Sequence, residues 1–292
     1  MSVVSRSVRP WPGENTPEAL DAEYNLRTRH PERQEVYEAY SHRSELVRST
    51  IPVDLDVSYG PHERSVVDLF PVSGAQAILV FFHGGYWRAL DKSIFSFIAA
   101  PFVEAGYAVA LPNYPLAPET PIAGIVDQAL AAVTWIGENR DRLGAQADTP
   151  IAVTGHSAGG HLSAICAATN WIDHGLEPNL ISACVPISGL FELEPLRHTN
   201  VAAQVHMTAD EARRLSPIHR SHARAVPTLL IVGGDETDGF VWQSGAYQDH
   251  LTQLGTDAEL CEEPGFNHFT ILEPLADPGH PLHHRVLRLL AP

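Results

Sequence analysis

Short apolar runs and longer amphipathic stretches alternate along most of the chain. A continuous run such as AILVFF at 77–82 is typical of a strand covered on both faces of a sheet. The stretch 121–143 has apolar residues at helical spacing. The expected strands are 53–59, 66–70, 77–82, 107–111, 151–154, 181–187, 228–232 and 258–261, and the helices expected between and after the later strands are 91–104, 121–143, 158–171, 240–254 and 281–290. This alternation predicts an α/β fold, with a mainly parallel twisted sheet flanked by helices.

Two segments depart from the alternation. Residues 1–50 start with a stretch rich in proline, glycine and asparagine, and continue with one or two short helices that break near Pro31. Residues 189–224 are polar, contain four histidines and show no strand pattern. We therefore expect an N-terminal arm with helices over 1–50 and a single domain over 51–292, into which 189–224 is inserted as a small helical cap.

Composition and charge exclude several classes of protein. The chain has 292 residues, of which 44% are hydrophobic, so it can bury a sizeable core. With 35 acidic and 19 basic residues its net charge is −16, which argues against binding to nucleic acid or to an anionic membrane surface. No apolar run reaches the ~18 residues of a membrane-spanning helix, and no signal peptide is evident. Three cysteines are too few for a disulfide framework, which favours a reducing cytoplasm.

The most specific motif is GHSAG at 155–159, which fits the pattern G-x-S-x-G. It follows an apolar strand and precedes an alanine-rich helix, as the pattern requires. Glycines two positions before and after Ser157 allow a strained turn that lifts the hydroxyl out of the sheet, above the positive end of the helix. We interpret Ser157 as a nucleophile; the alternative is a glycine-rich turn without chemistry.

A second motif, HGGYW at 83–87, directly follows the expected strand 77–82. Its glycines allow the backbone N–H groups of Gly84 and Gly85 to point into a cavity. Together with the N–H of Ala158 they would form an oxyanion hole, as acyl transfer requires. The alternative is a tight turn that only connects two elements.

The general base is expected late in the chain, where His268 follows the last strand on a loop opened by Pro-Gly. The acid should follow the strand 228–232, and there Asp235, Glu236 and Asp238 compete. One of them would accept the Nδ1–H of His268 and stabilise the imidazolium. The order serine, acid, histidine is that of the α/β-hydrolase fold.

No metal or other cofactor is predicted. The acidic turn after strand 228–232 does not have the spacing of an EF-hand. The three histidines at 280, 283 and 284 are interpreted as a solvated cluster, because no ligand motif of a metal-dependent hydrolase accompanies them.

These motifs resemble those of the α/β-hydrolase superfamily, and more narrowly those of its kynurenine formamidase (arylformamidase) branch. The specific marker is HGGYW in place of the HGGG of many esterases and lipases. The similarity spans roughly residues 50–290 and also includes the segments 86–92, 106–114, 155–162, 240–244 and 267–269.

The resemblance implies a role for each motif. The family's nucleophile, base and oxyanion donors fall on Ser157, His268, Gly84, Gly85 and Ala158. Counting back from Phe240 without a gap places the acid on Glu236; many relatives have aspartate there, so Asp235 and Asp238 stay as alternatives. Trp242 replaces an arginine common in relatives, which weakens the case for the same substrate.

The implied activity is hydrolysis of a small acyl amide or ester by a serine hydrolase. N-Formyl-L-kynurenine would be cleaved to formate and kynurenine, with Tyr86 and Trp87 flanking the aryl ring unless they only pack the loop. The alternatives are a carboxylesterase with the same triad and a non-catalytic ligand-binding relative. The expected partner is a small molecule, and a homodimer is compatible with the sequence. Because Arg88 and Lys92 are the only basic residues near HGGYW in the sequence, a neutral ester or a zwitterion is favoured over a dicarboxylate.

Overall fold

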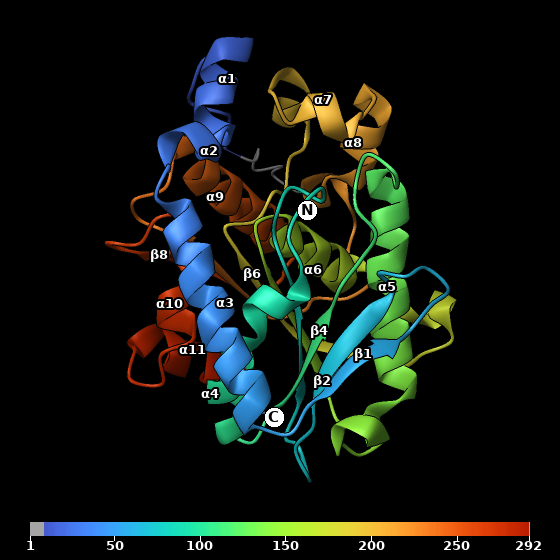
Figure 1. Ribbon diagram of the computed structural model, residues 1–292. Helices are drawn as coiled ribbons and strands as arrows, with labels where there is room; N and C mark the ends of the chain where they lie inside the picture. The colour runs from blue at the N-terminus through green and yellow to red at the C-terminus, as the bar shows by residue number, and fades with distance from the viewer. Residues whose placement is uncertain (1–8, 292) are drawn as a thin grey trace.

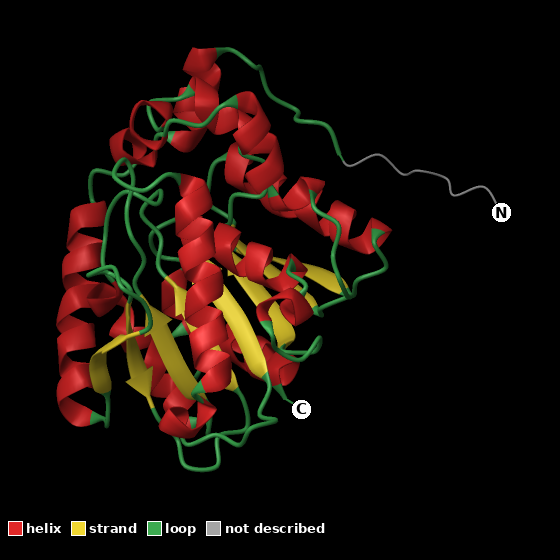
Figure 2. Cartoon of the chain, turned by 90° about the vertical axis from the view of Figure 1, so that its right-hand side faces the viewer, coloured by secondary structure: helices red, strands yellow, loops and turns green. Residues whose placement is uncertain are grey.

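The computed structural model describes residues 9–291. A sheet of eight strands lies at the centre of this part of the chain, between layers of helices (Figure 2). The strand order is β1-β2-β4-β3-β5-β6-β7-β8. Strand β2 pairs antiparallel with both of its neighbours, β1 and β4. All pairings from β4 to β8 are parallel. The strands are β1 (Asp54–Ser58), β2 (Val66–Phe70), β3 (Ile78–Phe82), β4 (Ala108–Pro112), β5 (Ile151–His156), β6 (Ile181–Ile187), β7 (Thr228–Gly233) and β8 (Ala258–Glu263).

Helices cover both faces of this sheet (Figure 1). The α-helices are α1 (Pro17–Tyr24), α2 (Leu26–Arg29), α3 (Arg33–Thr50), α4 (Ala99–Glu104), α5 (Ile122–Glu138), α6 (Ala158–Ala168), α7 (Ala202–Val205), α8 (Ala209–Leu215), α9 (Asp238–Gln253), α10 (Leu272–Leu275) and α11 (Pro281–Leu290). The 3₁₀ helices are η1 (Lys92–Ile98), η2 (Arg140–Leu143), η3 (Trp171–His174), η4 (Glu194–His198) and η5 (Pro217–His219). The predicted α/β fold is therefore confirmed.

The apolar run of β3 contributes to a core on each side of the sheet. Ile78, Val80 and Phe82 pack in the core beneath α5 and α6, whereas Leu79 and Phe81 pack in the core beneath η1, α4 and α11. Since side chains alternate across a strand, a strand covered on both faces needs apolar residues at every position. This explains why β3 shows a continuous run rather than an alternation.

Several predicted elements differ from the structure at their ends. Asp91 caps the helix that follows it, as predicted, but the first turns are the 3₁₀ helix η1 and only the last part is α4. The helix expected over 121–143 ends at Glu138 and continues as η2, which the left-handed Gly144 terminates. The short helix α10 was not predicted. Among residues 9–291, no helix has the length and hydrophobicity needed to cross a membrane.

The N-terminal helices pack on the rest of the chain. Leu20, Tyr24 and Leu26 are buried in the same core as α5 and α6. Helix α1 contacts α9 and η4, so α1 and α2 lie above the carboxyl edge of the parallel strands (Figure 1). Residues 1–8 of the predicted arm lie outside the described residues. The segment 189–224 contains η4, α7, α8 and η5, and it lies at the same edge.

Candidate active site

Ser157 lies on a sharp turn between β5 and α6, at the carboxyl edge of the sheet. Its backbone has φ 56° and ψ −115°, a conformation that non-glycine residues rarely adopt. The turn is closed by glycines: a Cβ at Gly155 would lie 2.3 Å from the carbonyl oxygen of Gly159, and one at Gly159 would lie 1.9 Å from that of Phe82. The small residues of the motif are therefore required by backbone contacts on both sides of the serine.

His268 faces Glu236 at the same edge of the sheet. The distance from Nδ1 of His268 to Oε2 of Glu236 is 2.6 Å, and the two side chains are 4% and 0% exposed. The other oxygen, Oε1, accepts hydrogen bonds from the hydroxyl of Ser188 and from the N–H of Gly233. Three donors thus hold the carboxylate in one orientation. Because Glu236 contacts only Nδ1 of His268, Nε2 of the same ring can exchange a proton with another group.

The structure separates the three carboxylates that the sequence left in competition. Asp235 and Asp238 are exposed, whereas Glu236 is buried and contacts His268. Glu236 is therefore the carboxylate that the loop after β7 brings to His268.

His156 supports the loop that carries His268. Its Nε2 lies 2.8 Å from the carbonyl oxygen of His268, and the two rings are 4.6 Å apart. Burial, together with the charge that His268 can carry, holds the pKa of His156 well below its ordinary value. His156 is therefore neutral, and because a carbonyl only accepts, its Nε2 carries the proton.

The glycines after β3 lie beside Ser157. A Cβ at Gly84 would be 3.0 Å from the carbonyl oxygen of His156 and 3.3 Å from Cβ of Ser157, and Gly85 has φ 105°. Within residues 9–291, neither N–H of Gly84 and Gly85 has a hydrogen-bond acceptor. Ala158 opens α6, so its N–H has no acceptor within the helix.

His83 fixes this loop. Its ring stacks on Tyr114 with centroids 4.3 Å apart, and the hydroxyl of Tyr114 donates to the His83 carbonyl oxygen at 2.7 Å. Burial lowers the pKa of His83 to about 4, so the ring is neutral. His83 thus positions the Gly84–Gly85 backbone.

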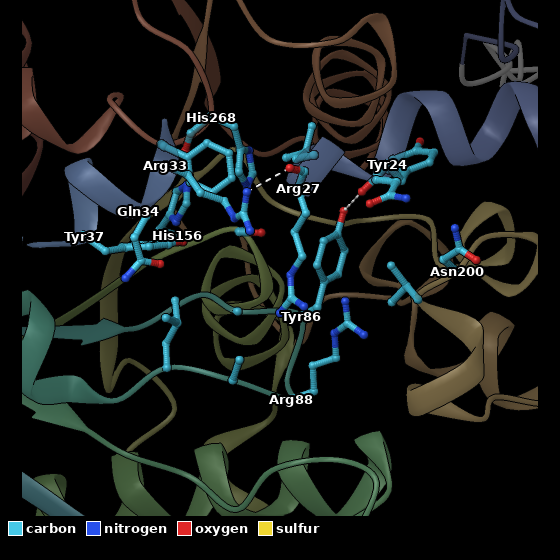
Figure 3. A pocket seen from close by; sticks show the side chains of 18 residues that line it. Tyr24, Arg27, Arg33, Gln34, Tyr37, Tyr86, Arg88, His156, Asn200 and His268 are labelled. Carbon is cyan, nitrogen blue, oxygen red and sulfur yellow. Dashed lines mark hydrogen bonds between the residues drawn. The ribbon is translucent and has the colours of Figure 1, made fainter. Parts of the chain in front are cut away.

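A cavity of about 200 Å³ opens at Ser157 and His268 (Figure 3). Besides the turn after β5 and the loop after β8, three parts of the chain line it: the N-terminal helices, the loop after β3 and the segment 189–224. The lining residues are Tyr24, Asn25, Leu26, Arg27, Arg33, Gln34, Tyr37, Gly85, Tyr86, Arg88, Ala89, Leu90, His156, Ser157, Asn200, Val201, His268 and Phe269.

The two aromatic residues of HGGYW have different surroundings. Tyr86 lines the cavity, and its hydroxyl donates to the carbonyl oxygen of Tyr24 at 2.6 Å. Trp87 is fully buried and packs edge-on against His161 at 5.1 Å, outside the cavity. Of the two alternatives that the sequence left open, Trp87 therefore packs the loop and does not line the cavity. The left-handed backbone at both residues turns the second side chain into the core.

The basic residues around the cavity also differ from the prediction. Lys92 is buried, and its Nζ lies 2.7 Å from both Asp68 and Asp56, away from the cavity. Arg27 and Arg33 reach the cavity instead, together with Arg88. They could not be found from the sequence, because they precede HGGYW by at least 50 residues and no local motif marks them.

Position 242 lies outside the cavity as well. The Trp242 indole donates to the carbonyl oxygen of Arg9 and packs edge-on against Trp11 at 5.4 Å. Trp242 itself therefore forms no part of the cavity wall. Among the described residues, no group of three or more His, Cys, Asp or Glu side chains is placed to hold a metal ion.

The chain is similar in sequence and structure to known hydrolases. A family model described as the α/β hydrolase fold matches residues 79–272. Kynurenine formamidase from Danio rerio is 28% identical over 256 residues, which are 85% of each chain. Carboxylesterase NlhH from Mycobacterium tuberculosis is 36% identical over 222 residues, 68% of this chain and 69% of that one. A crystal structure from Silicibacter sp., described as a candidate thioesterase, is 33% identical with a TM-score of 0.78 and covers 90% of this chain and 97% of its own.

Proposed function

Since the chain belongs to the α/β-hydrolase family and is a hydrolase of the arylformamidase or esterase type, we propose that Ser157, Glu236 and His268 are its catalytic triad. The observation that carries this proposal is the buried 2.6 Å contact between His268 and Glu236, at the sheet edge where Ser157 occupies its strained turn.

The first half of the reaction forms an acyl-enzyme. Nε2 of His268 takes the proton of the Ser157 hydroxyl while Oγ attacks the substrate carbonyl carbon. Glu236 accepts the Nδ1–H and stabilises the imidazolium. The imidazolium then protonates the leaving amine or alcohol, and the bond to the acyl carbon breaks.

The oxyanion of the tetrahedral intermediate accepts hydrogen bonds from the N–H groups of Gly84, Gly85 and Ala158. The turn held by His83 fixes the first two donors before the substrate arrives, so little reorganisation is needed as charge develops. In the second half, His268 deprotonates a water molecule that attacks the acyl-enzyme, and Ser157 recovers its proton.

The substrate proposed is N-formyl-L-kynurenine. Similarity to kynurenine formamidase from Danio rerio covers 85% of this chain, and HGGYW resembles the marker motif of that branch. The tyrosines Tyr24, Tyr37 and Tyr86 line the cavity and offer apolar ring surface to an aryl group. An anilide is also a better leaving group than an alkyl amide, which suits catalysis by a serine without a cofactor.

A carboxylesterase of different specificity is the second candidate, favoured by the 36% identity to NlhH. The two are separated by kcat/KM for N-formylkynurenine and for p-nitrophenyl acetate, measured on the same preparation. The formamidase proposal expects the formyl compound to be the better substrate. If only the ester is cleaved, the carboxylesterase assignment replaces it, and Ser157→Ala shows in either case whether the turnover depends on the serine.

A further inference from the structure

Three arginines reach the wall of the catalytic cavity from two distant parts of the chain (Figure 3). Arg27 comes from α2, Arg33 from the start of α3, and Arg88 from the loop after β3. No aspartate or glutamate lines this cavity, although the chain as a whole has a net charge of −16. The cavity is therefore a local concentration of positive charge in an acidic protein, and such a field attracts anions.

Among residues 9–291, neither Arg27 nor Arg88 forms an ion pair with an acidic side chain. Burial, and then the positive charge of Arg27, lower the pKa of Arg88, so the two side chains lie within electrostatic reach of each other. Nε of Arg88 is buried without a hydrogen-bond partner among the described residues. Another nitrogen of the same guanidinium donates to the side-chain amide oxygen of Gln204. Arg33 differs, because it donates to the carbonyl oxygens of Arg27 and His30 and holds the turn between α2 and α3.

Two acidic groups whose charge acts on Tyr86, in the cavity wall, are engaged elsewhere. Asp21 accepts hydrogen bonds from Asn25 at 3.0 Å and from the backbone and side chain of Asn200 at 2.8 and 2.9 Å. Glu236 is held by His268, at 2.6 Å from its Nδ1. Neither forms an ion pair with Arg27 or Arg88, so two like charges face the cavity without an anion between them.

The end of α1, which directly precedes the helix that carries Arg27, is fixed relative to the catalytic loops. The carbonyl oxygen of Glu23 accepts from the hydroxyl of Thr237, and its carboxylate accepts from the N–H of Gly239 at 2.7 Å. Tyr24 accepts from Tyr86 at 2.6 Å. Because α2 begins two residues after Tyr24, these contacts place the backbone of Arg27 beside the cavity.

We propose that Arg27 and Arg88 bind a carboxylate on the leaving-group part of the substrate, and that they select acyl compounds carrying such a group over neutral ones. A guanidinium offers paired N–H donors that match the two oxygens of a carboxylate. The proposal rests on the proposed function, in which the formyl part of the substrate is too small to carry the carboxylate.

The test uses a matched pair of aryl esters, 4-acetoxyphenylacetate and its neutral amide 4-acetoxyphenylacetamide. The wild-type protein is expected to prefer the carboxylate by about 10-fold or more in kcat/KM. Arg27→Gln and Arg88→Gln should each lower kcat/KM for the carboxylate by about 10- to 100-fold, mainly through KM. The same variants should change the amide by less than about two-fold.

The matched control is Arg29→Gln, which removes a guanidinium from the same helix at an exposed position outside the cavity, and should leave both substrates unaffected. Arg27→Lys keeps the charge without the fork and is expected to lose less than Arg27→Gln. Equal use of both esters by the wild type, or equal losses for both in the arginine variants, would overturn the carboxylate site.

Binding of the product 4-hydroxyphenylacetate to Ser157→Ala, measured by calorimetry, separates this proposal from the hydrolase proposal. If neither N-formylkynurenine nor the two esters are turned over, but the product binds and Arg27→Gln in the Ser157→Ala background weakens its binding, the carboxylate site stands and the triad assignment fails. If the esters are turned over through Ser157 without preference for charge, the triad stands and the carboxylate site fails. Absence of both the preference and the binding refutes the site.

Discussion

Ser188 donates a hydrogen bond from its hydroxyl to Oε1 of Glu236, the oxygen opposite the one that faces His268. The serine directly follows β6 and has φ 47°, so its backbone is held in a rarely populated conformation at the point where its side chain meets the carboxylate. This contact was not foreseen, because no motif surrounds Ser188 in the sequence. It identifies Ser188 as a positioning residue for the proposed triad.

Replacing Ser188 by alanine should lower kcat about ten-fold with little change in KM, because the carboxylate loses a charge-assisted hydrogen bond but the cavity wall is unchanged. Ser182→Ala is the control: it lies at the other end of β6, bonds only to the carbonyl oxygen of Ile151 at 3.2 Å, and should have no effect on kcat. Steady-state kinetics measure both. A larger effect on KM than on kcat would contradict the positioning role.

The acid of the triad can be tested by removing one charge at a time. Glu236→Gln should lower kcat by about 10³- to 10⁴-fold, since an amide cannot orient and stabilise the imidazolium of His268 as the carboxylate does. Asp235→Asn and Asp238→Asn alter exposed side chains and are expected to stay within about two-fold of the wild type. If one of these two variants is the inactive one, the assignment of Glu236 is wrong.

This competition shows what the sequence could and could not predict. GHSAG and HGGYW are short patterns that can be recognised in the sequence, although the backbone contacts of Gly159 with Phe82 and of Gly84 with His156 join the two turns to each other. Three carboxylates within four positions look alike in a sequence, and only the course of the loop determines that Glu236 is buried beside His268. Arg27 was missed for a related reason, because its place in the cavity depends on how α2 crosses the sheet edge.

The turn around Ser157 should tolerate no side chain at position 159. In Gly159→Ala the added Cβ would lie 1.9 Å from the Phe82 carbonyl oxygen, which is backbone and cannot rotate away, so we expect a loss of about 3 kcal/mol or more in the free energy of unfolding. Gly175→Ala is the control, because that glycine has φ 78° but no atom within 4 Å of the added Cβ. Gly175→Ala should lower the free energy of unfolding by only about 1–2 kcal/mol, the cost of a left-handed backbone at alanine. Denaturant unfolding of both variants would show the difference, and similar losses would mean that the turn can relax.

Lys92 and Asp68 form a buried ion pair at 2.7 Å, with side-chain exposures of 5% and 1%. Lys92→Met should lower the free energy of unfolding by about 3–5 kcal/mol, because it leaves the carboxylate buried without its partner. Adding Asp68→Asn to this variant should recover part of the loss, so the two substitutions are not additive.

The pH dependence of this ion pair provides an independent measurement. Burial acts to lower the pKa of Lys92, but the hydrogen bonds to Asp56 and Asp68 outweigh it and hold the pKa above its ordinary value of 10.5. A pKa that is raised on folding contributes stability that is fully present below the pKa of the unfolded state and is lost as the pH rises through that of the folded state. The difference in stability between the wild type and Lys92→Met, followed by denaturant unfolding, should therefore be constant near neutrality and decrease only above about pH 10.5. A decrease between pH 6 and 8 would instead assign the stabilisation to another group.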